Sequence, residues 1–290
     1  MVPLDYDDGG PGLAFFTLSD GGRVRYEIIG SGVPIVVTPG GTAGLDELWP
    51  MAHELSRHYQ VLLWDRRNTG RSDICFDGPS EGQMWRQDLA ELVQGLGLGP
   101  LHVLGGSGGS RMSLFFAIGH PELVRKLVVW NAVGGWFAGA ILAGGRYTPM
   151  IRAAWIGGME AVAEVPQMAE LIADNPRNRE LLLAWDPMDF IARMKEWARF
   201  YLPEGDKILT GGMTEEQLSG LPMKTLIFQG GDDSHPPELS EEYHRLIPDS
   251  RLIAPARWDS HDWWSLWTKN EHFAVWRELV PEIVEFLQED

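Results

Sequence analysis

The sequence predicts an α/β fold with a mostly parallel central sheet, helices on both faces of that sheet, and an inserted helical subdomain. Short apolar runs bounded by Gly, Pro and Asp alternate with longer helical patterns, which is typical of parallel strands that are buried on both faces. A chain of 290 residues is long enough for one large domain of this class. The alternation stops between residues 135 and 221, where one helical pattern follows another.

The individual elements follow from hydrophobic period and from the residues that bound each run. We expect strands at residues 24–29, 35–38, 61–64, 101–104, 127–130, 225–228 and 252–254. We expect helices at residues 47–58, 83–95, 107–118, 237–246 and 270–287, the last interrupted at Pro281, and further helices at 158–173 and 187–200. Residues 1–134 and 222–290 are therefore predicted to form the core, and residues 135–221 a helical cap.

Composition excludes several classes of protein. The 41 acidic and 24 basic residues give a net charge of −17, which makes nucleic acid or an anionic membrane an unfavourable partner. The single cysteine, Cys75, excludes an internal disulfide and a multi-cysteine metal site, and fits a reducing, cytoplasmic setting. The apolar run at 127–145 contains five glycines and Asn131, so a buried strand leading into a loop is favoured over a membrane helix. We expect a monomer or homodimer that acts on a small molecule.

The strongest chemical signal is the segment 101–110, LHVLGGSGGS. A strand runs into G-x-S-x-G and then into a helical pattern, and the small residues around Ser107 permit a tight turn that lifts its hydroxyl from the backbone. The Gly108 amide then lies at a helix amino terminus, where it can donate to a developing oxyanion. The alternative is an ordinary glycine-rich turn with a helix-capping serine.

With this motif the chain resembles the α/β-hydrolase superfamily, and two further segments match. Thr38-Pro39-Gly40-Gly41 stands where that family has its oxyanion loop, which implies that the Gly41 amide is the second oxyanion donor. The segment 65–72, DRRNTGRS, resembles the family's D-x-R-G-x-G-x-S turn, with Asn68 in place of a glycine. Asn is a reasonable substitute because it tolerates a left-handed backbone. We interpret Asp65 as structural.

A serine nucleophile needs a base and an acid that orients it, and the family order is serine, acid, histidine. The turn after the strand at 225–228 resembles the family's G-x-x-D acid turn and implies Asp233 as the acid, with its neighbour Asp232 as the alternative. His261 follows the last strand, where the family has its catalytic histidine, and His272 is the alternative. His235 is interpreted only as part of the acid turn.

The predicted mechanism uses side chains and backbone amides alone, so no cofactor and no metal are expected. Some tryptophans are expected to line an apolar cleft between cap and sheet; Trp136, Trp155 and Trp264 are candidate substrate contacts. Arg111 either holds a substrate carboxylate or pairs with an acidic side chain.

Several functions remain open at this stage. We expect hydrolysis of a small, largely apolar ester or lactone. Within the serine enzymes the nucleophile segment and the turn at 65–67 look most like proline iminopeptidases, so aminopeptidase or amidase action is one alternative, and carbon–carbon bond hydrolysis is another. The non-enzymatic alternative is a small-ligand receptor on the same fold.

Overall fold

A computed structural model describes residues 14–202, 209, 211–254 and 273–289. Within these residues one sheet of eight strands has the order β1-β2-β4-β3-β5-β6-β7-β8. At the β1 edge of the sheet, the pairs β1–β2 and β2–β4 are antiparallel. The remaining neighbours, from β4 and β3 to β7 and β8, pair in parallel. The strands are β1 (Ala14–Thr17), β2 (Arg23–Gly30), β3 (Pro34–Thr38), β4 (Gln60–Trp64), β5 (Leu101–Gly106), β6 (Val124–Trp130), β7 (Thr225–Phe228) and β8 (Ser250–Ile253).

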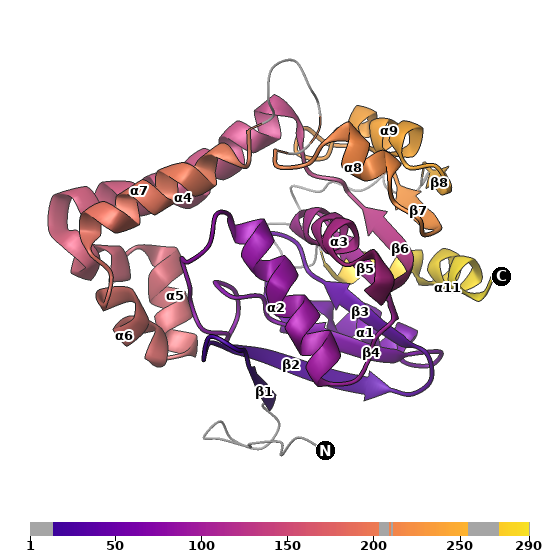
Figure 1. Cartoon of the computed structure of the whole chain (residues 1–290), viewed down its shortest axis with the longest axis horizontal. Helices are drawn as coiled ribbons and strands as arrows, with labels where there is room; N and C mark the ends of the chain where they lie inside the picture. Colours follow the sequence, from indigo (N-terminus) through magenta and orange to yellow (C-terminus); the bar gives the residue numbers. More distant parts are fainter. Residues whose placement is uncertain (1–13, 203–208, 210, 255–272, 290) are drawn as a thin grey trace.

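The predicted mostly parallel sheet is confirmed, and helices cover both of its faces (Figure 1). The helices are α1 (Trp49–Leu55), α2 (Glu81–Gly95), α3 (Gly108–Gly119), α4 (Gly135–Ala163), α5 (Pro166–Asp174), α6 (Arg177–Leu183), α7 (Pro187–Arg199), α8 (Glu215–Ser219), α9 (Pro237–Leu246) and α11 (Val280–Gln288). Short 3-10 turns are η1 (Leu45–Leu48), η2 (Pro121–Leu123) and η4 (Ala274–Leu279).

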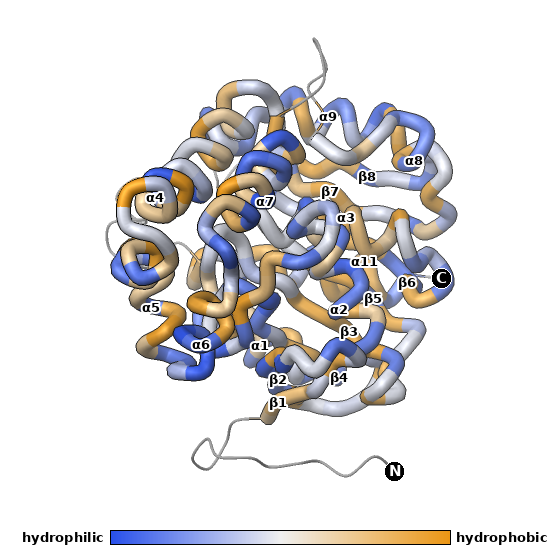
Figure 2. Tube along the Cα trace, turned by 60° about the vertical axis from the view of Figure 1, so that its left-hand side comes forward, coloured by the Kyte–Doolittle hydropathy of each residue, from blue (hydrophilic) through white to orange (hydrophobic). Residues whose placement is uncertain are grey.

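The alternation of side chains along the strands divides the core into two clusters. On β3, Val36 packs with α2 and α3, whereas its neighbours Ile35 and Val37 pack with α1 and α11 on the opposite face. Because both faces are covered, the central strands are apolar throughout, and Figure 2 shows them as a mainly orange path through the molecule.

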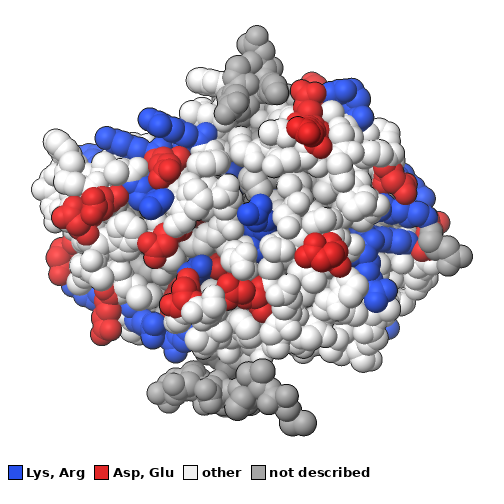
Figure 3. All heavy atoms as spheres, in the orientation of Figure 1, with Lys and Arg blue, Asp and Glu red and all other residues white. Residues whose placement is uncertain are grey.

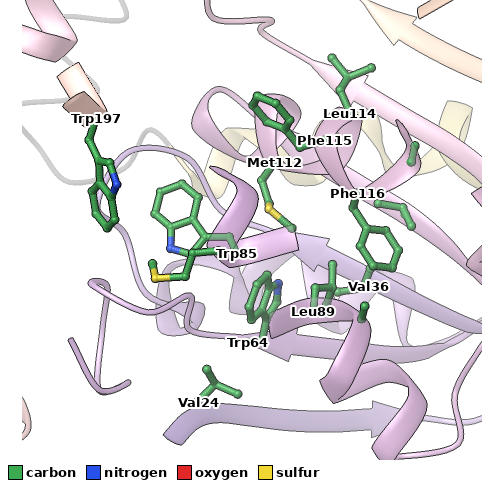
Figure 4. Close-up of a cluster of buried hydrophobic side chains, with 14 of the residues drawn as sticks. Val24, Val36, Trp64, Trp85, Leu89, Met112, Leu114, Phe115, Phe116 and Trp197 are labelled. Atoms are coloured by element: carbon green, nitrogen blue, oxygen red, sulfur yellow. The ribbon is translucent and has the colours of Figure 1, made fainter. Parts of the chain in front are cut away.

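The cluster on the α2 and α3 face is rich in aromatic side chains. Figure 4 shows Trp64 of β4, Trp85 of α2, and Met112 and Phe116 of α3 among the side chains of this cluster. All four side chains are buried. Burial on this scale stabilises the fold by roughly 25 cal/mol for each Å² of apolar surface removed from water.

Two differences from the sequence-based expectations have clear physical reasons, and one further expectation is confirmed. Strand β1 was missed because it is a four-residue edge strand whose side chains are only partly buried. Helix α4 begins at Gly135, so the glycine-rich stretch expected to form a loop is helical instead. The predicted break near Pro281 is confirmed, since η4 ends at Leu279 and α11 starts at Val280 with a proline in its first turn.

Helices α4 to α8 all fall between β6 and β7, and no described residue of this insertion belongs to a strand. Helices α4 and α7 pack along each other, with α5 and α6 at one end of the pair (Figure 1). The limits 134/135 and 221/222 lie between elements, which is compatible with the predicted cap, although its independence as a subdomain stays a prediction.

Charged side chains of both signs are interspersed over the face drawn in Figure 3. Among the helices of the described chain, none is both long and apolar enough to cross a membrane.

Candidate active site

Ser107 lies in a strained turn between β5 and α3. Its backbone has φ 53° and ψ −123°, a left-handed conformation that non-glycine residues seldom adopt. The turn is held because the Ser107 amide donates to the Trp130 carbonyl at 3.1 Å, while the Ser107 carbonyl accepts from the Ser110 amide at 2.9 Å and its hydroxyl at 2.6 Å. Ser107 itself stays half-buried, so its hydroxyl is placed at the carboxyl edge of the sheet.

Neighbouring glycines are required by close approach of other atoms. A Cβ at Gly106 would lie 2.0 Å from Nε1 of Trp130, and a Cβ at Gly109 would lie 2.1 Å from the Thr38 carbonyl oxygen. Such separations are far below van der Waals contact. The glycine pattern of the segment is thus explained by close packing of β5 against β6 and of α3 against β3.

The Gly40–Gly41 loop after β3 lies against the same turn. A Cβ at Gly40 would be 2.7 Å from the Cβ of Ser107, and one at Gly108 would be 3.1 Å from the Gly41 amide nitrogen. Gly41 has φ +50°, which favours glycine. The structure therefore brings Gly41 and Gly108, the two predicted oxyanion donors, together beside Ser107.

The turn at 65–72 is a structural support, as its sequence indicates. The buried Asp65 carboxylate accepts from the Leu45 amide at 2.6 Å and the Arg71 amide at 2.9 Å. Asn68 has φ 66°, the left-handed conformation expected where the family has glycine. Its side chain also exchanges two hydrogen bonds with the backbone of Cys75, at 2.8 and 2.9 Å.

The turn after β7 places a histidine on the serine. Nε2 of His235 lies 2.9 Å from Oγ of Ser107, and Nδ1 of His235 lies 2.8 Å from Oδ2 of Asp232. The Asp232 carboxylate also accepts from the amides of Ser234 and His235, at 2.8 and 3.0 Å. Burial alone would raise the pKa of Asp232, but these hydrogen bonds and the facing imidazole outweigh it and hold the pKa below its ordinary value.

Sequence reasoning missed His235 as a partner of the serine. The available signal was the spacing: Asp232 and His235 are three residues apart directly after β7, and β7 is separated from β5 only by β6. Carboxyl ends of parallel strands meet at one edge of the sheet, so this spacing places both residues at the edge where Ser107 lies.

The predicted acid and base are not brought together in the part of the chain that the structure describes. Asp233 is exposed and makes no hydrogen bond to another described residue. It lines a pocket of about 460 Å³ beside the turn, with Phe137 of α4 and Glu238 of α9. His261 and its alternative His272 lie outside the described residues, so their places relative to Ser107 stay predictions.

Two of the three candidate substrate contacts lie within the described residues, and their role stays a prediction. Trp136 and Trp155 are 67% and 71% exposed, so neither indole is enclosed between the insertion and the sheet. Both belong to α4, in turns that also contain the buried Ala138 and Ala154. Trp264 lies outside the described residues.

Arg111 is buried, and it pairs with no carboxylate among the described residues. Its Nη2 donates to the carbonyls of Phe200 and Gly211, at 3.1 and 3.3 Å. Its guanidinium also stacks 4.7 Å from the ring centroids of Phe115 and Tyr201. Arg111 therefore ties α3 to the end of the insertion. No three His, Cys, Asp or Glu side chains of the described ranges gather as a metal would require.

Comparisons with known proteins agree with this architecture. Residues 33–145 match the family model described as alpha/beta hydrolase fold. A protein named putative carbamate hydrolase RutD, from Azorhizobium caulinodans, is 28% identical over 256 residues, which covers 81% of this chain and 87% of that protein. Its namesake from a Caulobacter species is 34% identical over 102 residues, 35% of this chain and 37% of its own length.

Solved structures are similar over almost the whole chain. The enol-lactonase from Burkholderia xenovorans has a TM-score of 0.60 at 18% identity and covers 95% of this chain and 100% of its own. An esterase from Exiguobacterium antarcticum has a TM-score of 0.60 at 20% identity, with 95% and 99% covered. At these identities the likeness shows a shared fold.

Proposed function

The chain belongs to the α/β-hydrolase superfamily, and from this premise we propose that it is a serine hydrolase that cleaves a small, largely apolar ester or lactone. One observation carries the proposal: Ser107 occupies the strained turn between β5 and α3, and an imidazole nitrogen lies 2.9 Å from its hydroxyl oxygen. A serine hydroxyl becomes a useful nucleophile near neutral pH when such a base accepts its proton.

The proposed reaction proceeds through an acyl-enzyme. Ser107 Oγ attacks the substrate carbonyl while its proton moves to a histidine, and the amides of Gly41 and Gly108 donate to the oxyanion that forms. Collapse of this intermediate expels the alcohol, which takes the proton back from the histidine. Water then repeats the sequence and releases the acid. The pairs that could supply the base and its orienting acid are His261 with Asp233, from the sequence, and His235 with Asp232, from the contacts.

Carbamates form a second candidate substrate class. The similarity to the protein named putative carbamate hydrolase RutD over 81% of this chain favours them. A carbamate carbonyl can be attacked in the same way, since its carbon carries a leaving group and its oxygen would enter the same oxyanion site. The ester and carbamate proposals therefore share the nucleophile and differ in the leaving group.

Active-site labelling tests the nucleophile. A fluorophosphonate probe should modify the folded protein at Ser107, located by mass spectrometry of the digested adduct, and Ser107→Ala should remain unlabelled. The small-ligand-receptor alternative predicts no turnover on any substrate. Failure of the folded wild-type protein to label at Ser107 would contradict the serine-hydrolase proposal.

A substrate panel tests the class of bond. We expect short-chain aryl esters and lactones to give higher kcat/KM than aryl carbamates and proline arylamides, each measured against the Ser107→Ala variant. A preference for carbamates would support the second candidate, and a preference for proline arylamides would favour the aminopeptidase alternative.

A further inference from the structure

We propose that Arg66 is the positioning residue of the oxyanion loop, residues 39–44, and that its hydrogen bond to Gly41 aims the Gly41 amide at the substrate oxygen. The inference rests on the proposed serine-hydrolase function and adds a residue to it. Nη2 of Arg66 donates to the Gly41 carbonyl at 2.9 Å, and Arg66 is fully buried. Arg66 occupies the variable position of the D-x-R-G pattern, so the turn itself does not require an arginine there.

Consecutive residues after β4 hold the loop in its middle and at its end. The Asp65 carboxylate accepts from the Leu45 amide at 2.6 Å, which fixes the point where the loop enters η1. Arg66 binds the carbonyl of Gly41, four residues earlier. Gly41 also borders a cavity of about 450 Å³, whose far wall includes residues of α5. Because a cavity adjoins the middle of the loop, the contact with Arg66 is what holds it there.

The backbone at Gly41 converts this contact into the direction of an amide. The Gly40 carbonyl accepts from the Ala43 amide at 3.2 Å, and in a trans peptide the next N–H points the opposite way, out of this turn. The Gly41 nitrogen lies 3.1 Å from the place of a Cβ at Gly108, and it donates to no described residue. Arg66 fixes the following peptide plane. Both planes that meet at Gly41 are therefore held, and its N–H is left for a ligand.

Packing alone does not account for a buried arginine at this position. The neighbouring Arg67 pairs with the Asp88 carboxylate. Arg66 pairs with no carboxylate in the described part of the chain, and its Nε and Nη1 have no hydrogen-bond partner there. Its guanidinium lies 4.6 Å from the ring centroid of Trp85. A buried cation without a carboxylate is unfavourable for stability, so an apolar side chain would serve packing better.

Arg66 remains a charged donor at neutral pH. Burial, together with the nearby Arg146 guanidinium, lowers its pKa to about 10, and the Glu81 carboxylate opposes this decrease. At pH 7 to 8 the guanidinium is therefore protonated. A charged donor binds a carbonyl oxygen more strongly than a neutral one does.

The aim of the Gly41 amide matters most when negative charge develops on the substrate oxygen. The neutral carbonyl of the bound substrate gains little from this donor, whereas the tetrahedral oxyanion gains much more. A loop that loses Arg66 should therefore bind substrate almost normally and stabilise the transition state poorly. That difference separates a positioning role from a role in substrate binding.

Steady-state kinetics with p-nitrophenyl butyrate test the role of Arg66. Arg66→Met has a similar length but no donor, and it should lower kcat by about 10- to 10²-fold with KM within about twofold of wild type. The Ki of a trifluoromethyl ketone, whose adduct with Ser107 places an oxyanion in the same site, should rise by the factor by which kcat/KM falls. Arg66→Lys keeps a charged donor and should lose less activity than Arg66→Met.

The double variant Arg67→Gln/Asp88→Asn is the matched control. It removes the adjacent buried guanidinium and leaves two amides that can still bond to each other. Neither side chain contacts the oxyanion loop. Its kcat and Ki should stay within about twofold of wild type, even where its melting temperature falls.

Wild-type kcat and Ki in folded Arg66→Met would overturn the inference and leave Ser107 labelling, and so the proposed function, intact. Equal losses in Arg66→Met and the control, or a change confined to KM, would also overturn it. If Arg66→Met does not fold, Arg66→Lys decides: a fall in kcat with a parallel rise in Ki supports the positioning role, and unchanged values contradict it. A folded wild-type protein with no labelling at Ser107 and no turnover would contradict the proposed function and this inference with it.

Discussion

The positions around Ser107 require glycine, because the Cβ of an alanine would clash with neighbouring atoms. A Cβ at Gly109 would lie 2.1 Å from the Thr38 carbonyl oxygen, a backbone atom of a central strand that cannot move away cheaply. We therefore expect Gly109→Ala to lower the free energy of unfolding by about 3 kcal/mol or more, as overpacking of a buried site does. Gly144→Ala is the matched control, because a Cβ added there, on the exposed side of α4, would meet nothing within 4 Å. It should stabilise the protein by about 0.5–1 kcal/mol, and urea unfolding measures both variants.

Asn68 shows how one residue can replace a glycine and gain contacts. It accepts the strain of φ 66° and forms two hydrogen bonds to the Cys75 backbone. Asn68→Gly should relieve the strain but lose the bonds, for a net cost of about 1 kcal/mol. Asn68→Ala loses the bonds and keeps the strain, so it should be less stable by about a further 1 kcal/mol. Equal stability of the two variants in urea unfolding would contradict this account.

His102 on β5 makes stability depend on pH. Burial, with Lys126 and Arg125 nearby, lowers its pKa from 6.5 to about 4. Because the unfolded chain binds this proton more readily, the free energy of unfolding should be fully retained above pH 6.5 and fall by about 3 kcal/mol toward pH 4. His102→Gln should remove this part of the decline. Urea unfolding of the wild type and His102→Gln at pH 7 and pH 4.5 tests this prediction. If the difference in free energy of unfolding between the two proteins were the same at both pH values, the role of His102 would be contradicted.

At the scale of elements, the insertion is joined to the core by a buried polar cluster around Glu81 of α2. Its carboxylate accepts from Arg146 at 2.6 Å and Tyr147 at 3.0 Å, both on α4, and from Tyr201 at 3.1 Å. The ion pair is largely shielded, with side-chain exposures of 2% for Glu81 and 11% for Arg146. One core helix therefore anchors α4 and the segment that follows α7.

Glu81→Ala should cost about 3–5 kcal/mol of unfolding free energy, because it leaves the Arg146 guanidinium buried without its partner. The double variant Glu81→Leu/Arg146→Met should recover part of that loss, since neither charge then remains buried. Glu160→Ala is the control: it breaks a solvent-exposed pair with Arg179 and should cost less than about 1 kcal/mol. If both single variants lost equal stability in urea, the cluster would not be the anchor.

The sequence predicted most of the elements because their signals are local. Strand β7 and helix α9 match at both ends, since apolar runs, prolines and turn residues delimit them. Helix α4 was missed at its start because Gly135, Gly139, Gly144 and Gly145 have low helix propensity and its helical form depends on packing against α7. The sequence also predicted the nucleophile turn and the Asp65 turn, because each is formed by residues that are adjacent in the chain. It did not predict the contact of His235 with Ser107, because these residues are 128 positions apart and their contact depends on how the turn after β7 folds back.

At the scale of the whole molecule, the net charge of −17 should make stability sensitive to salt. An excess of like charges disfavours the compact state, and raising ionic strength from 0.01 to 0.15 M shortens the screening distance from about 30 to about 8 Å. Exposed ion pairs weaken at the same time, but each contributes at most about 1 kcal/mol. Relief of repulsion should therefore prevail.

We expect the melting temperature at pH 7.5 to rise by about 2–6 °C across this range of NaCl, which corresponds to roughly 1–2 kcal/mol for a chain of this size. Glu164→Lys/Glu170→Lys changes two exposed side chains and the net charge from −17 to −13, so the rise should become smaller. Glu164→Asp/Glu170→Asp keeps the charge and should keep the wild-type dependence. Calorimetry over the salt series measures all three proteins, and a melting temperature that falls with salt would mean that surface ion pairs outweigh the repulsion.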